Sequence, residues 1–119
     1  MDWGAREMSE SLGEKTWHEA KELAEKNAIA VVPIGAFEQH GKHLPLDTDM
    51  RLVTMVANRS AQIVKSKGIP IVVTPPVWTA FSPHHMNFSG TITLSMSSFV
   101  NVLQDICRCL KIGRASCRV

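Results

Sequence analysis

Apolar residues recur at helical spacing near the start of the chain, from residue 14 to residue 27. The members of this stripe are Trp17, Ala20, Leu23 and Ala24. Such spacing predicts an amphipathic helix. Thr16, followed three residues later by Glu19, has the pattern of a capping box and predicts where the helix begins. The uninterrupted apolar run over 28–34 is short and rich in β-branched residues, which favours a buried strand.

A helical stripe followed by a short apolar run occurs a second time along the chain. Residues 49–67 place apolar side chains broadly on one face of a second predicted helix, and Gly68 is suited to terminate it. These side chains are Leu52, Val53, Val56, Ala57, Ile63 and Val64. Residues 69–74 form a second short apolar run, and therefore a second predicted buried strand. The order helix, strand, helix, strand predicts a βαβ unit, a parallel sheet and the α/β fold class.

The pattern is less regular after the second predicted strand. Residues 77–90 indicate a long loop, and the alternation over 91–94 indicates either a short strand or a turn. A last helix is predicted over 99–111, capped by Ser97 or Ser98. The residues that it would turn inward are Val102, Leu103, Ile106 and Leu110.

Length and composition fit one small domain. The chain has 119 residues, of which 45% are hydrophobic and 20% charged, so it can build a core and is unlike a disordered segment. Two of its 13 lysines and arginines lie in the last eight residues, and the other 11 equal the 11 acidic residues in number. The body of the chain is therefore neutral, which argues against nucleic acid or an anionic membrane surface as a partner.

The cysteines and the start of the chain bear on its compartment. An odd number of cysteines, at positions 107, 109 and 117, favours reduced thiols. The first ten residues lack the basic and apolar regions of a signal peptide, and no apolar run has the length of a membrane span. These observations predict a cytoplasmic protein with no membrane partner.

The two ends of the chain fall outside the predicted domain, which covers 14–111. Residues 1–13 are polar and contain Gly and Ser, so we expect a loosely ordered arm there. Residues 112–119 break the pattern of the last helix, and the stretch IGRASCR looks like one reading frame of a sequencing adapter. We expect a non-native tail at this end, and the alternative is a genuine polar tail.

Potential metal ligands are concentrated at the end of the first predicted strand, in PIGAFEQHGKHLPLDTD at 33–49. They are Glu38, His40, His43, Asp47 and Asp49. In an extended segment Glu38 and His40 project to the same side. Asp49 would begin the second helix, where a carboxylate meets the positive end of the helix dipole. Glu, His and Asp together suit Zn²⁺, Mn²⁺ or a similar divalent ion, and a carboxylate can bridge two ions.

Other interpretations of these residues stay open. An isolated Glu-x-His pattern more often consists of polar surface residues than of metal ligands, and His43 and Asp47 could be ordinary solvated loop residues. His84 and His85 form a second polar cluster, in which one ring could polarise a substrate or carry a proton near neutral pH. Both could equally be plain loop histidines, and as neighbours in regular structure they would not point the same way.

Two segments resemble the creatininase (creatinine amidohydrolase) family. The first, VVPIGAFEQHGKHLPLDTD at 31–49, is similar to the family's pattern of Glu-Gln-His-Gly, x, His-Leu-Pro-Leu, x, Thr-Asp. The second, SPHHMNFSGTITLS at 82–95, is similar to the family's His-x-x-Phe-Pro-Gly-Thr segment. The resemblance covers 14–111, and the first motif is long and quite specific, so the resemblance rests on it.

The resemblance implies an αβα layered fold, a homo-oligomer, and hydrolysis of cyclic or other C–N amide bonds with a pair of divalent metal ions. We expect these ions to be Zn²⁺, with Mn²⁺ as the alternative. Carried over to this sequence, Glu38 would bind one metal, His40 the other, and Asp49 would bridge them. His84 and His85 would be the catalytic side chains that lie near a small-molecule amide substrate.

The chain departs from the family pattern mainly in its length. Residues Lys42, Asp47 and Ser89 also differ from the residues that are frequent in the family, but none of them is an implied ligand. The family's further His and Glu ligands belong to a later Asn-Gly-His-type segment, which these 119 residues do not contain. We therefore expect about the N-terminal half of the fold, an incomplete metal site and no activity in this chain by itself. The alternative, suggested by the short length, is a non-catalytic α/β binding or regulatory module.

Overall fold

The computed structural model describes residues 10–112, and within them it contains three α-helices and a pair of strands. In chain order the elements are the 3₁₀ helix η2 (Leu12–Glu14), α1 (Trp17–Glu25), β1 (Ile29–Val31), α2 (Thr48–Ser66), β2 (Ile71–Val73), the 3₁₀ turn η3 (Pro83–His85) and α3 (Met96–Ile112). Residues 1–9 of the expected arm and 113–119 of the expected tail lie outside the described residues.

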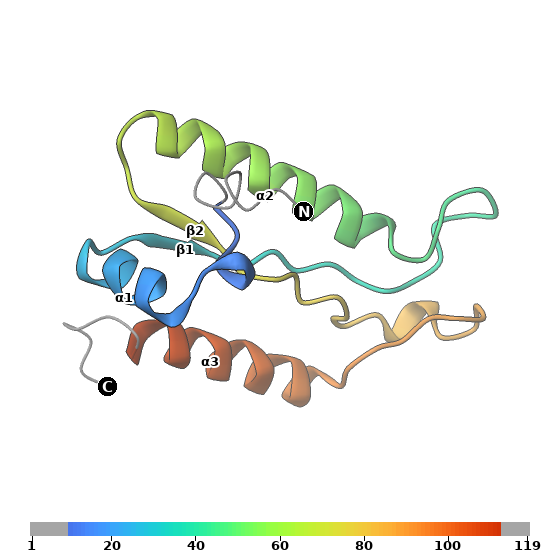
Figure 1. The fold of residues 1–119 in the computed structure, drawn as a ribbon. Helices are drawn as coiled ribbons and strands as arrows, with labels where there is room; N and C mark the ends of the chain where they lie inside the picture. Colours follow the sequence, from blue (N-terminus) through green and yellow to red (C-terminus); the bar gives the residue numbers. More distant parts are fainter. Residues whose placement is uncertain (1–9, 113–119) are drawn as a thin grey trace.

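The two strands are parallel, as the order of elements predicts. Their paired residues are Ile29 with Ile71, Ala30 with Val72, and Val31 with Val73. The connection between them contains α2, which packs on β2. Figure 1 shows α2 on one side of the strands and α1 and α3 on the other, which gives three layers in the order αβα. The predicted α/β fold class and parallel sheet are confirmed.

The first helix begins where its capping pattern predicts. Thr16 is the N-cap of α1, and its side-chain hydroxyl accepts a hydrogen bond from the backbone N–H of Glu19 at 3.2 Å. The Glu19 carboxylate in turn accepts one from the backbone N–H of Thr16 at 3.1 Å. Both bonds satisfy N–H groups that have no partner inside the helix.

Replacing Thr16 with alanine removes the hydroxyl half of this capping box. We expect the Thr16→Ala variant to lose about 1 kcal/mol of unfolding free energy, because an N–H of the first turn loses its acceptor. Urea unfolding followed by circular dichroism measures the loss. Thr16→Ser keeps the hydroxyl and serves as the control, so equal midpoints for the two variants would contradict the role of the cap.

A small core lies between α2 and β2. Ala57 and Ala61 of the helix pack against Ile71 and Val73 of the strand, and Ala61 is fully buried. Small side chains on α2 let the helix approach the sheet closely. Adding or removing one methyl group at this contact would therefore disturb the packing.

Several side chains predicted to be inward are exposed instead. Trp17 is 70% exposed and Ile29 is 47% exposed, so β1 is not the buried strand that its apolar run predicts, whereas β2 is buried throughout. On α2 the exposed members of the predicted stripe are Leu52, Val56 and Ile63. The physical reason is that burial depends on neighbours, and within residues 10–112 the sheet has only these two strands.

The chain segments next to the helices also differ in detail from the prediction. The N-terminal end of α3 is capped by Ser95, whose hydroxyl accepts from the Ser98 N–H at 3.2 Å, so the predicted caps Ser97 and Ser98 are wrong. Residues 10–13 of the expected arm contact the sheet, since Val73 N–H donates to the Glu10 carbonyl at 2.8 Å.

Among the described helices, none combines the length and apolarity needed to cross a membrane.

Candidate metal centre

The loop that leaves β1 is held in an extended form between two later segments. Ile34 forms a parallel bridge with Val77, and Phe37 forms an antiparallel bridge with Ile92. The N–H of Gly35 donates to the Val77 carbonyl at 2.9 Å, and that of Ile92 donates to the Phe37 carbonyl at 3.0 Å. The loop therefore lies beyond the carboxyl ends of both strands, where parallel α/β proteins place their chemistry.

Gly35 brings this loop into direct contact with the start of α2. A Cβ atom added at Gly35 would lie 2.7 Å from the backbone nitrogen of Met50 and 2.9 Å from its Cα, distances that a real Cβ does not adopt. Only a residue without a side chain therefore fits between the loop and the helix. This contact holds the loop that contains Glu38 against the turn of α2 that contains Asp49.

Glu38, His40 and Asp49 come together at this place. Each offers a ligand atom, and these atoms all lie within 4.8 Å of one another. The Nε2 atom of His40 is 3.5 Å from Oδ1 of Asp49. All three residues are partly buried. Asp49 is the second residue of α2, where the unpaired N–H groups of the first turn favour a negative charge.

The donor set of this cluster fits a divalent metal ion. Among the described residues, Glu38 Oε2 and His40 Nε2 are buried with no hydrogen-bond partner, a state that costs about 1–3 kcal/mol per group unless another partner binds. The His40–Asp49 separation of 3.5 Å is long for a hydrogen bond, yet close to the roughly 3.3 Å between two ligand atoms of one tetrahedral Zn²⁺. Carboxylate oxygen and imidazole nitrogen are ligands for Zn²⁺ and Mn²⁺.

The two other candidate ligands on the loop lie apart from this cluster. His43 is exposed and belongs to neither group of possible metal ligands found within residues 10–112. Asp47 accepts a hydrogen bond from Arg51 Nε at 2.8 Å, one turn further along α2. This hydrogen bond, together with the negative charge of Asp47, raises the pKa of Arg51 above its usual value. Asp47 is therefore engaged in an exposed ion pair.

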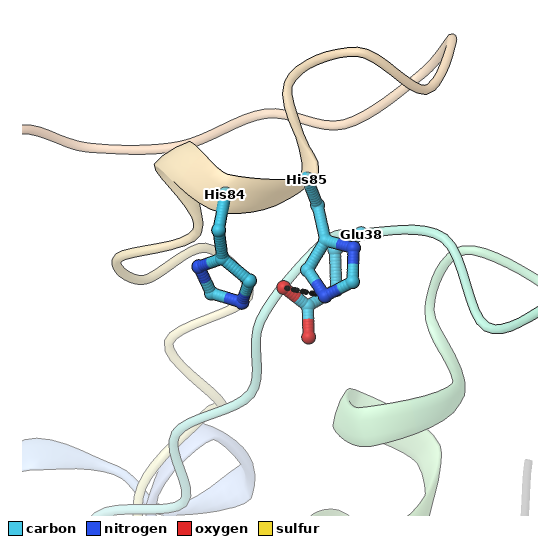
Figure 2. A group of neighbouring side chains, drawn as sticks. All are labelled: Glu38, His84 and His85. Atoms are coloured by element: carbon cyan, nitrogen blue, oxygen red, sulfur yellow. Dashed lines mark ion pairs between the residues drawn. The ribbon is translucent and has the colours of Figure 1, made fainter.

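The turn η3 places two histidines beside Glu38. Figure 2 shows the rings of His84 and His85 on the Glu38 side of the turn, with His85 Nε2 3.7 Å from Glu38 Oε2. Their ring centroids are 4.3 Å apart, and with Glu38 they form a second group of possible metal ligands. The expectation that the two rings point apart is wrong, because a 3₁₀ turn separates adjacent side chains by about 120° rather than by half a turn.

Contacts distant in sequence hold η3 in this position. The N–H of Ser82 donates to Thr93 Oγ1 at 2.7 Å, and the N–H of Leu94 donates to the Ala80 carbonyl at 2.8 Å. The segment that contains η3 is thus paired with residues 92–94. Because Ile92 also pairs with Phe37, the two histidines and Glu38 are tied to one framework.

The sequence analysis did not single out Gln39, although this residue also belongs to the site. Its Nε2 atom lies 3.0 Å from His85 Nδ1, and its Oε1 atom accepts from the Gly41 N–H at 2.8 Å. The only local signal was its position between two candidate ligands. The contact with His85 spans 46 residues, so no pattern within the loop predicts it.

The creatininase family model, described as creatinine amidohydrolase, matches residues 13–114. This chain belongs to the creatininase family. The family resemblance of the loop motif is thereby confirmed.

Relatives of this creatininase-family chain are hydrolases of more than one kind. It is 32% identical to creatinine amidohydrolase from Pseudomonas putida over 104 residues, which cover 85% of this chain and 40% of the relative. It is 31% identical to a mycofactocin precursor peptide peptidase from Mycobacterium tuberculosis over 99 residues, which cover 79% and 39%. The chain thus spans about two fifths of the length of these relatives.

Solved structures show the same fold. A creatininase with manganese superposes with a TM-score of 0.78 at 30% identity, covering 88% of this chain and 41% of that one. A mutant creatininase of zinc–zinc type gives the same TM-score and coverage. The creatininase-like αβα fold class is confirmed, and the solved members include manganese and zinc forms.

Proposed function

We propose that this creatininase-family chain carries metal-binding residues of a hydrolase that cleaves a C–N bond in a small-molecule amide or a related substrate. The observation that carries the proposal is the cluster of Glu38, His40 and Asp49. Two of its possible ligand atoms are buried and have no hydrogen-bond partner among the described residues. Relatives that are an amidohydrolase and a peptidase, and a mutant creatininase complexed with creatine, support the bond type. Because the chain spans about two fifths of its relatives, the activity is proposed for a protein that contains this region.

The three clustered side chains receive separate roles. Glu38 would hold one divalent ion, His40 the other, and Asp49 would lie between the two, with Zn²⁺ preferred and Mn²⁺ as the alternative. The ions would supply Lewis-acid chemistry at the substrate carbonyl. The start of α2 places its positive end at the Asp49 carboxylate, beside the position proposed for the ions.

His84 and His85 are proposed as the catalytic side chains. His85 is the more buried of the two, and its Nε2 atom faces Glu38. A substrate bound beside Glu38 would therefore lie within reach of this ring, and the exposed ring of His84 flanks the same place. Imidazole is suited to proton transfer near neutral pH, which the departure of an amine requires.

The compartment and the oligomeric state of the chain are also proposals. Residues 14–111 form the family-like part of the chain, and we propose a cytoplasmic homo-oligomer as its working form. Met55 and Val56 of α2 are each 62% exposed, and exposed apolar side chains in a group are typical of surfaces that bind another protein.

Metal removal tests the proposed function. A protein of the relatives' full length that contains this region is stripped with a chelator and assayed for hydrolysis of creatinine and of a short peptide. We expect the rate to fall at least about 100-fold and to return with Zn²⁺ or Mn²⁺, because metal ions carry several kcal/mol of transition-state stabilisation. Activity that survives metal removal would contradict the proposal. A chain that folds cooperatively but binds no metal would favour the non-catalytic module.

A further inference from the structure

The side chain of Gln39 lies between the backbone of Gly41 and the ring of His85. The N–H of Gly41 points at one end of the Gln39 amide, 2.8 Å away. A backbone N–H can only donate, so the amide atom facing it must be the oxygen. The NH₂ group of Gln39 is then the atom 3.0 Å from His85 Nδ1. Since an NH₂ group also only donates, Nδ1 must accept, and the neutral ring carries its proton on Nε2.

The reverse arrangement is unfavourable for a definite reason. If the Gln39 amide were flipped, its oxygen could accept a proton from His85 Nδ1, but its NH₂ group would face the Gly41 N–H at hydrogen-bond distance. Two donors would then oppose each other, with one acceptor lost. Gly41 adopts φ +70°, a backbone conformation that residues other than glycine rarely take. In this turn the N–H of Gly41 lies within hydrogen-bond distance of the Gln39 side chain.

We infer that Gln39 is a positioning residue that holds His85 as an Nε2–H donor and so keeps it out of the metal-ligand set. Glu38 belongs to two groups of possible ligands, one with His40 and Asp49 and one with the two histidines of η3. A ring nitrogen that carries a proton has no lone pair for a metal ion, and the other nitrogen of His85 is taken by Gln39. By contrast, His40 Nε2 is buried without a hydrogen-bond partner among the described residues.

The inference deepens the proposed function and rests on it for its chemical meaning. With Nε2–H directed to the Glu38 side, His85 offers a hydrogen bond to an acceptor atom of the substrate. The substrate class that fits is one with a carbonyl oxygen or a leaving nitrogen at this place. Gln39 would act only through His85, because its amide is occupied by Gly41 and by the imidazole ring.

Imidazole ¹⁵N NMR on the metal-free 119-residue chain tests the tautomer directly. We expect the neutral His85 ring to show a protonated Nε2 and an unprotonated Nδ1. Gln39→Glu replaces the NH₂ group with a second acceptor, so the ring should switch to the Nδ1–H tautomer. Gln39→Met, which is similar in size and has no hydrogen-bonding amide, should give a mixture. An Nδ1–H tautomer in the parent chain would overturn the inference.

Zn²⁺ binding to the same chain separates this inference from the proposed function. His40→Ala should lower Zn²⁺ affinity at least about tenfold, whereas His85→Ala should change it less than about twofold. In the Gln39→Glu background the freed Nε2 becomes a possible ligand, so His85→Ala should then lower the affinity. An equal loss for His40→Ala and His85→Ala in the parent would contradict the exclusion of His85. If neither substitution matters but the predicted tautomer is observed, the metal proposal fails and the positioning by Gln39 stands.

Discussion

A glutamine in place of Glu38 is expected to lower Zn²⁺ affinity about 100-fold and the metal-dependent rate at least about 1,000-fold. The substitution keeps the size of the side chain and removes its charge, so the loop can keep its path. The lost group is a charged oxygen that is buried without a hydrogen-bond partner among residues 10–112. A neutral amide oxygen is a much weaker ligand for a divalent ion.

The same Glu38→Gln variant should not destabilise the metal-free chain. A buried carboxylate oxygen without a hydrogen-bond partner is costly, and a neutral amide at the same place loses less solvation on burial, so the substitution lowers this cost. Isothermal titration with Zn²⁺ and urea unfolding of the metal-free chain measure the two effects. Asp47→Asn is the matched control, because that carboxylate of the same loop is paired with Arg51. Equal losses of affinity in the two variants would contradict the assignment of Glu38.

Local signals in the sequence predicted the parts of the fold that depend on neighbouring residues. Thr16 and Glu19 are three residues apart, and their reciprocal bonds form as the pattern indicates. Gly68 adopts φ +80° after α2, as expected of a residue that terminates a helix. The pairing of Asp47 with Arg51, four residues apart, was equally local and could have been found from the sequence.

The site was predictable only in part, for the same physical reason. Glu38 and His40 lie two residues apart on an extended loop, so local geometry brings them together, whereas Asp49 reaches them through the packing of Gly35 against the start of α2. The orientation of His84 and His85 depends on a turn that is held by pairing with residues 92–94. Contacts of that kind leave no periodic trace in the sequence.

Burial was the least predictable property. The apolar stripe of α2 correctly indicates a helix, but only the small residues Ala57 and Ala61 are buried, while Val56 of the same stripe is exposed. Periodicity reports which side chains share a face, and the elements packed against that face decide how much of it is covered.

Gly35→Ala is expected to damage both the fold and the metal site. The added Cβ would meet backbone atoms of Met50 at 2.7 and 2.9 Å, and neither atom can move unless α2 shifts away from the loop. Overpacking of this kind costs about 1–3 kcal/mol of unfolding free energy. We expect the shift also to increase the distance from Glu38 to Asp49, because Gly35 lies between the loop and the start of α2. We therefore expect Zn²⁺ affinity to fall at least about tenfold, since site geometry controls affinity.

Gly68→Ala provides the control that separates these two effects. Gly68 lies at the opposite end of α2, and an added Cβ would meet no atom within 4 Å, but its φ of +80° makes alanine strained. This control should lose about 1 kcal/mol of unfolding free energy through backbone strain and keep its Zn²⁺ affinity. Urea unfolding and Zn²⁺ titration of both variants give the comparison. A Gly35→Ala variant that binds Zn²⁺ as well as Gly68→Ala does would show that the contact with Met50 does not set the geometry of the cluster.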